Sequence, residues 1–208
     1  MRHTLVITIA FQLLVSCSSA NPQMQSDQMK GVAQEAVEQY FPPGVFGQDA
    51  NKERRYASLL AAMQEPSLFE TARKGEITEY RLLMPLNDRA LSFRLELLVD
   101  GTGELAVARV ILHPGKPDSV LLNDRASVSA ERVREFVTLL EKAEFWKLDT
   151  EEKRDKVRYE TKGIQWVLEG VRNREYHVVD RLSQTDRDFV RACIFLMSLT
   201  PNSQSTPE

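Results

Sequence analysis

The stretch LSFRLELLVDGTG, residues 91–103, is the clearest indicator of the fold. Its first nine residues place apolar side chains at alternate positions, with mostly polar ones between them. An alternation with a period of two predicts a half-buried β-strand. The Asp100-Gly101 step that follows is a strong signal for a hairpin turn. The stretch therefore predicts two antiparallel strands, 91–99 and 104–112.

Two further strands are predicted on either side of this hairpin. Segment 77–84 precedes it and segment 118–126 follows it, so that the four strands form an antiparallel meander. Ser129 is a good N-cap for a helix over 130–144. The apolar stripe of this helix consists of Val133, Phe136, Val137 and Leu140.

The last third of the chain repeats the change from strands to a helix. Two strands are expected near 157–171 and 175–183, and a final helix over 186–199. The sequence therefore predicts an α+β fold, with an antiparallel sheet of about six strands, helices on one face and a helical N-terminal extension. Trp166 alternates with apolar neighbours and Trp146 directly follows the 130–144 helix, so both indoles are expected to be mostly buried.

The region before the sheet shows helical spacing of apolar residues. Helices are predicted over 29–41, ended by Pro42-Pro43-Gly44, and over about 53–64. The expected organisation is a signal segment (1–16), a flexible tether (17–28), a helical N-terminal part (29–74), an α+β domain (75–200) and a disordered tail (201–208).

The first residues are typical of an export signal. Arg2 supplies a positive start, and the apolar run from Leu5 to Val15 is too short to cross a membrane. The run ends in Leu14-Val15-Ser16-Cys17, which resembles a bacterial lipobox. The resemblance implies that a diacylglycerol is attached to the Cys17 thiol and that the chain is cut before Cys17. The mature protein would then be a lipoprotein anchored in a membrane of the bacterial cell envelope.

Two further interpretations of this region stay open. An ordinary signal peptidase could cut after Ala20, which would release a soluble periplasmic protein that starts near Asn21, or Cys17 could be incidental. With lipidation, Ser18 after the cysteine resembles the sorting signal of outer-membrane lipoproteins. The expected partner is therefore the membrane, through the lipid anchor, with another envelope protein as the candidate second partner.

Composition narrows the classes of function. Hydrophobic residues make up 42% of the 208 residues, enough for a core without disulfides, and the net charge of −3 argues against a nucleic-acid binder. The chain contains no glycine-rich phosphate loop and no usual hydrolase or zinc motif, so no cofactor and no metal are predicted. His113 and His177 are far apart in sequence, and Cys193 lies among apolar residues as a small hydrophobe.

The most unusual block begins Trp166-Val167-Leu168-Glu169-Gly170 and continues, after a turn, with Tyr176-His177 and Arg181. It resembles a block of the form W-x-L-E-G, turn, Y-H-x-V-x-R in exported bacterial proteins of unknown function. Physically the block is a hairpin. With a two-residue turn at Asn173-Arg174, Glu169 faces Val178, whereas a longer turn would place Glu169 opposite His177.

Two classes of function follow from these observations. The first is a lipid-anchored envelope protein that binds a partner or supports a structure without catalysis. The second is a small envelope hydrolase or ligand-binding protein whose cleft is formed by Glu169, His177 and Arg181, with Glu169 and His177 as acid and base. The first class has no catalytic residue, these three are the candidates under the second class, and Cys17 is the predicted lipidation site.

Overall fold

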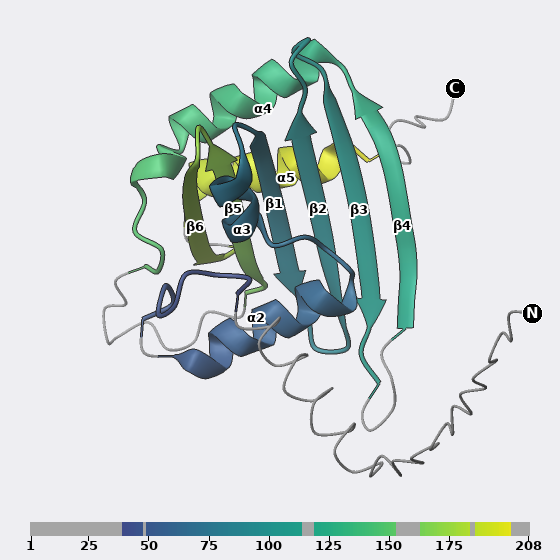
Figure 1. Ribbon diagram of the computed structural model, residues 1–208, viewed down its shortest axis with the longest axis vertical. Coiled ribbons are helices and arrows are strands. Elements are labelled where there is room, and N and C mark those ends of the chain that lie inside the picture. The colour runs from purple at the N-terminus through teal and green to yellow at the C-terminus, as the bar shows by residue number, and fades with distance from the viewer. Residues whose placement is uncertain (1–38, 48, 114–118, 153–162, 184–185, 201–208) are drawn as a thin grey trace, which may run out of the picture. The chain divides into compact units, whose positions relative to one another are not determined.

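The computed structural model describes residues 39–47, 49–113, 119–152, 163–183 and 186–200. Within them the chain forms one antiparallel six-stranded sheet, with helices before, between and after the strands (Figure 1). The strands are β1 (Thr78–Pro85), β2 (Arg89–Leu97), β3 (Gly103–Ile111), β4 (Ser119–Val128), β5 (Gln165–Arg172) and β6 (Glu175–Leu182). The helices are α2 (Ala50–Ala62), α3 (Leu68–Lys74), α4 (Ala130–Lys142), the 3-10 turn η1 (Phe145–Lys147) and α5 (Arg187–Ser198).

The α+β class and the six-stranded antiparallel sheet are confirmed. The order β4-β3-β2-β1-β5-β6 contains the predicted four-strand meander, and the second hairpin is added next to β1. The stretch that opened the sequence analysis forms β2, its turn and the start of β3. The turn hydrogen bonds run from Gly101 N to the Leu98 carbonyl and from Leu98 N to the Thr102 carbonyl.

Each face of the sheet is covered by its own helices. Residues such as Tyr80, Leu82 and Trp166 point toward α4 and α5 and share one apolar core with them. Residues such as Leu83 and Val167 point the other way and pack with α2 in a second core. Figure 1 shows α2 and α3 in front of the sheet and α5 behind it. The N-terminal helical part is therefore the second cover of the sheet.

The helix ends follow the expected capping chemistry. The Ser129 side chain accepts a hydrogen bond from Arg132 N, as predicted for the start of α4. The Asp186 side chain accepts from two backbone N–H groups at the start of α5. The side of α4 that faces the sheet carries Val133, Phe136 and Leu140, which are buried in the core shared with α5.

Some elements differ from the prediction. The short helix α3 was not predicted, because its single apolar turn is too short to show a helical period, although Ser67 caps it. The predicted strand near 157–171 begins only at Gln165, and its first residues lie outside the described part of the chain. The predicted helix 29–41 also lies largely outside it, as do the signal segment, the tether and the tail. Among the described residues, none of the helices has the length and apolar character needed to span a membrane.

Candidate functional site

The β5–β6 hairpin decides whether the predicted Glu169–His177 pair exists. Its turn is Asn173-Arg174, with φ values of 51° and 66°, as in a two-residue type I′ turn. This turn places Glu169 opposite Val178 and Gly170 opposite His177. Because neighbouring residues of a strand point to opposite faces, Glu169 and His177 lie on different sides of the sheet. The two side chains therefore do not form an acid–base pair.

Glu169 is fully buried on the face covered by α2 and α3. Its Oε2 accepts a hydrogen bond from Arg81 Nε at 2.8 Å and lies 2.6 Å from Arg81 Nη2. Its Oε1 accepts the Tyr176 hydroxyl at 2.9 Å. Burial raises the pKa of the Glu169 carboxyl, and the Arg81 guanidinium opposes this effect. The carboxylate connects β5 to β1 and β6, which is a structural role.

A network of buried charges continues from this pair. Glu65, which follows α2, lies 2.7 Å from Arg94 Nε and 3.8 Å from Arg81 Nη1. Arg94 also reaches Glu79, at 2.5 Å. Arg81 donates a further hydrogen bond to the carbonyl oxygen of Pro66. The network therefore fixes the connection between α2 and α3 to the sheet.

His177 lies on the opposite face, against the turn that follows α4. Its ring centroid is 5.1 Å from that of Phe145 and 6.0 Å from that of Trp146. Burial lowers the pKa of the His177 imidazole, the backbone groups of Leu148 and Phe145 oppose this effect, and the Arg181 charge adds to it. His177 is thus a half-buried packing residue and not a member of an open cleft.

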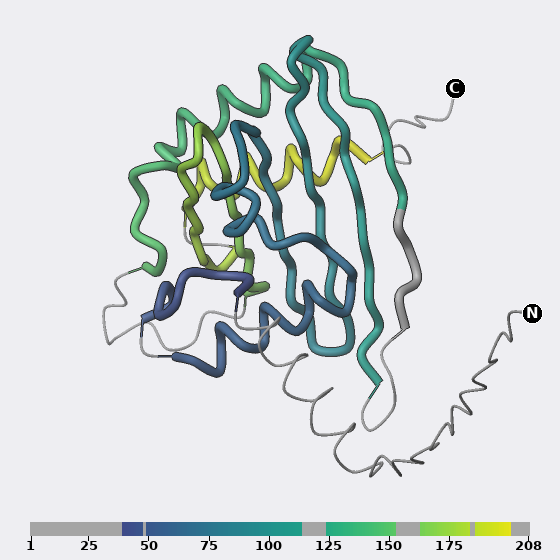
Figure 2. Tube along the Cα trace, viewed as in Figure 1, coloured from purple at the N-terminus to yellow at the C-terminus, as the bar shows by residue number. Residues whose placement is uncertain are grey.

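Arg181 shares the face of His177 but points to the edge of the sheet. Its guanidinium donates hydrogen bonds to the carbonyl oxygens of Asp149 at 2.7 Å and Thr150 at 2.9 Å. The backbone N–H of Asp180 donates to the same Thr150 carbonyl at 2.7 Å. Residues 148–152 are in this way attached along β6, and Figure 2 shows this green segment beside the strand. Glu169, His177 and Arg181 do not share one cleft.

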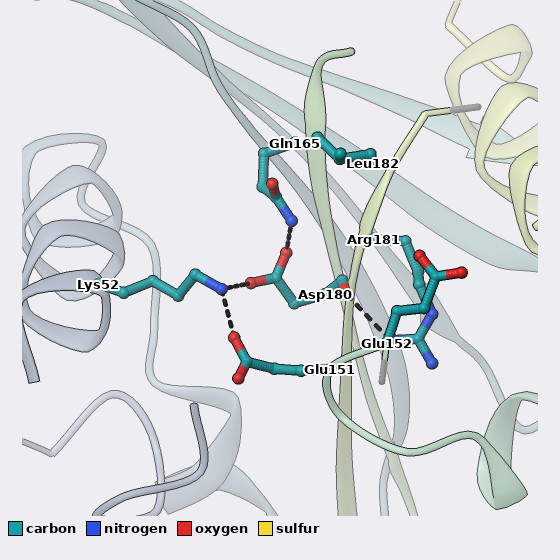
Figure 3. Close-up of a pocket in the computed structure, with 7 residues that line it drawn as sticks. All are labelled: Lys52, Glu151, Glu152, Gln165, Asp180, Arg181 and Leu182. Atoms are coloured by element: carbon teal, nitrogen blue, oxygen red, sulfur yellow. Dashed lines mark hydrogen bonds and ion pairs between the residues drawn. The ribbon is translucent and has the colours of Figure 1, made fainter. Parts of the chain in front are cut away.

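A small polar pocket does exist on the other side of β6 (Figure 3). It encloses about 270 Å³, including space open to solvent. Its lining residues are Lys52, Glu151, Glu152, Gln165, Asp180, Arg181 and Leu182. Lys52 extends from α2 toward Asp180 and Glu151, whereas the Arg181 side chain points away from them.

Asp180 is the centre of this pocket. Its carboxylate is buried and lies 2.7 Å from Lys52 Nζ, and it accepts hydrogen bonds from Tyr56 at 3.3 Å and from Gln165. Lys52 is also paired with Glu151. The two carboxylates hold the pKa of the Lys52 ammonium above its usual value, although burial opposes them. Burial next to Asp180 raises the pKa of the Tyr56 hydroxyl. The Lys52 ammonium and the Tyr56 hydroxyl therefore stay protonated near neutral pH, and the cluster holds α2, β5 and β6 together.

The remaining candidates are placed as follows. Cys17 lies outside the described residues. Cys193 is fully buried in α5, and burial raises the pKa of its thiol well above the usual value, which makes it inert as a nucleophile. His113 follows β3, far from β6. Among the described residues, no group of three or more His, Cys, Asp or Glu side chains is arranged to hold a metal ion.

The cations that pair with Glu169 and Asp180, namely Arg81 and Lys52, were not singled out by the sequence. Arg81 is 88 residues from Glu169, and Lys52 is 99 residues from Glu151. An arginine in an otherwise apolar strand was the available signal, because a buried guanidinium needs a carboxylate partner. The family models searched do not match the chain, and no curated protein shows significant similarity to it.

Proposed function

We propose that the chain is a lipid-anchored, periplasm-facing protein of the bacterial cell envelope, attached to the outer membrane, that acts by binding a partner or supporting a structure. The observation that carries the proposal is the Leu14-Val15-Ser16-Cys17 ending of a short apolar run, followed at once by a polar segment. Two or more acyl chains at one cysteine give stable anchoring, because each buried methylene contributes about 0.8 kcal/mol.

The described part of the chain supports binding over catalysis. Buried side chains able to do acid–base chemistry, such as Glu169 and Asp180, have partners that join one element to another. Arg181 and His177 hold the segment after α4 against β6. These residues are therefore engaged in keeping the layers of the fold together.

The test compares the full chain with two cysteine variants in a Gram-negative host. The wild-type protein should be found in the membrane fraction, with a mature mass that begins at Cys17 and includes the attached lipid. Cys17→Ala should lose the added mass and leave the membrane. Cys193→Ala is the matched control, because Cys193 is buried in the core, and its lipid mass and membrane location should equal those of the wild type.

Two results would contradict the proposal. One is an unmodified wild-type chain that starts at Asn21. The other is a Cys17→Ala variant that stays in the membrane fraction with the same mass addition as the wild type.

A further inference from the structure

The two edge strands of the sheet, β6 and β4, differ in whether other parts of the described chain pair with their outer side. Along β6, residues 148–152 cover the edge: Asp180 N donates to the Thr150 carbonyl, and Glu151 forms a parallel bridge with Asp180. An edge strand with unpaired backbone groups is a template for another strand, and proteins commonly cover such edges. The end of the β6 edge at Asp180 is therefore covered by the chain itself.

The β4 edge shows no such cover within the described residues. One side of β4 pairs with β3, and no other strand or backbone group among those residues pairs with its second side. A shift in register between Arg109 and Val110 interrupts the β3–β4 ladder near one end, and regular pairing runs from Leu122 to Val128. This regular stretch is about 20–23 Å long, the usual length of a strand.

The sequence of β4 lacks two of the residues that often block an edge. Residues 119–128 contain no lysine and no proline. The exposed charges at its centre are Asp124 and Arg125, which are adjacent and so point to opposite faces. Arg125 is partnered on the β3 side, where its Nη1 lies 2.7 Å from Glu104. The open side thus presents one charge of each sign, one on each face.

We propose that the open edge of β4 binds an extended segment of another envelope protein as a seventh strand. Backbone hydrogen bonds would supply affinity, and the two charges would select a segment with a basic residue opposite Asp124 and an acidic residue opposite Arg125. The proposal deepens the proposed function and depends on it for the partner's location in the envelope.

A second copy of this chain fits the edge less well. Two copies can pair through β4 in an antiparallel way, related by a twofold axis perpendicular to the sheet. Each side chain then lies opposite a side chain of the other copy on the same face of the sheet. The register that pairs the whole stretch from Leu122 to Val128 with itself is centred on Arg125. It places two arginine side chains directly opposite each other, and like charges in that position are destabilising. The charges therefore favour a different sequence as the partner strand.

The experiment places a photo-cross-linking amino acid at Asp124 or at Ala126 of the full chain in its native envelope. These two positions are on the same face of β4 and two residues apart. Glu135, exposed on α4, is the control position. We expect both β4 positions to cross-link to one segment of one protein, at sites two residues apart, and Glu135 not to do so.

Charge reversal supplies the second measurement. Asp124→Lys should lower the cross-linking yield at Ala126 by about tenfold, because an attractive cross-strand pair becomes a repulsive one. The melting temperature should stay unchanged, since Asp124 is exposed.

The edge proposal is overturned by attachment sites that are scattered, by cross-links to this chain itself, including residues 1–38 or 201–208, or by a yield no higher than at Glu135. Lipidation is scored by intact mass in the same sample. If the chain is lipidated but the attachment sites on the partner are not two residues apart, the edge proposal is wrong while the proposed lipid anchor stands.

Discussion

Only a hydrogen atom fits on the inner side of Gly170. A Cβ at this position would lie 2.7 Å from Phe145 Cε1 and 3.0 Å from the Tyr80 ring. The two rings fill the space where β5 passes beneath the turn after α4. The glycine of the Trp166–Gly170 block is therefore explained by close packing, without any flexibility of the backbone.

Gly170→Ala should lower the free energy of unfolding by about 1–3 kcal/mol, the usual cost of overfilling a packed core. Gly75→Ala is the matched control, because a Cβ there meets nothing within 4 Å and the backbone of Gly75 is extended. The control should stay within about 0.5 kcal/mol of the wild type. Denaturant melts of the three proteins decide, and equal midpoints for the two variants would show that the rings move aside.

At the scale of elements, two side chains of α2, Lys52 and Tyr56, bind Asp180 of β6. The Lys52 ammonium pairs with the buried carboxylate of Asp180. The other side chains that donate hydrogen bonds to this carboxylate are neutral. Lys52→Met would leave the Asp180 charge without its cation. The expected loss is about 1–3 kcal/mol, the usual cost of leaving a buried polar group without its partner, and hydrogen exchange should speed up in α2 and in residues 149–152.

The matched control for this change is Lys147→Met. Lys147 also pairs with a glutamate, at 2.7 Å, but both partners are exposed. Exposed ion pairs contribute little to stability, so this variant should melt with the wild type and show unchanged exchange. Equal behaviour of the two variants would mean that the Lys52 contact does not hold α2 in place.

The elements themselves were largely predictable from sequence, whereas their polar connections were not. Strand β2 and its turn follow from local alternation and an Asp-Gly step, and α4 and α5 from apolar stripes. The Arg81–Glu169 contact depends on β5 inserting beside β1, which is a choice of topology that no local pattern contains. The sequence made Glu169 a candidate site residue. It did not predict Arg81 as the partner of Glu169, because it did not predict that β5 pairs with β1.

At the scale of the whole molecule, Glu169 on one face of the sheet and His177 on the other should make stability depend on pH in opposite directions. On the α2 face, burial raises the pKa of Glu169 above its ordinary value of 4.5. The folded protein then holds this proton more tightly than the unfolded one, so the Glu169 contribution falls as pH rises through the folded pKa. On the α4 face, burial lowers the pKa of His177 below 6.5, so its contribution is lost as pH falls below that value.

The two contributions can be separated with one variant on each face. Relative to the wild type, His177→Phe, which keeps a ring against Phe145, should gain stability as pH falls from 7.5 to 5. Relative to the wild type, Glu169→Gln should lose stability as pH falls toward 4.5, because the raised pKa of Glu169 gives the folded wild type an uptake of a proton that the variant lacks. The measurement is the free energy of unfolding by denaturant at several pH values. Parallel curves for both variants and the wild type would show that neither side chain titrates differently in the folded state, and that burial between the layers leaves the pH dependence of the fold unchanged.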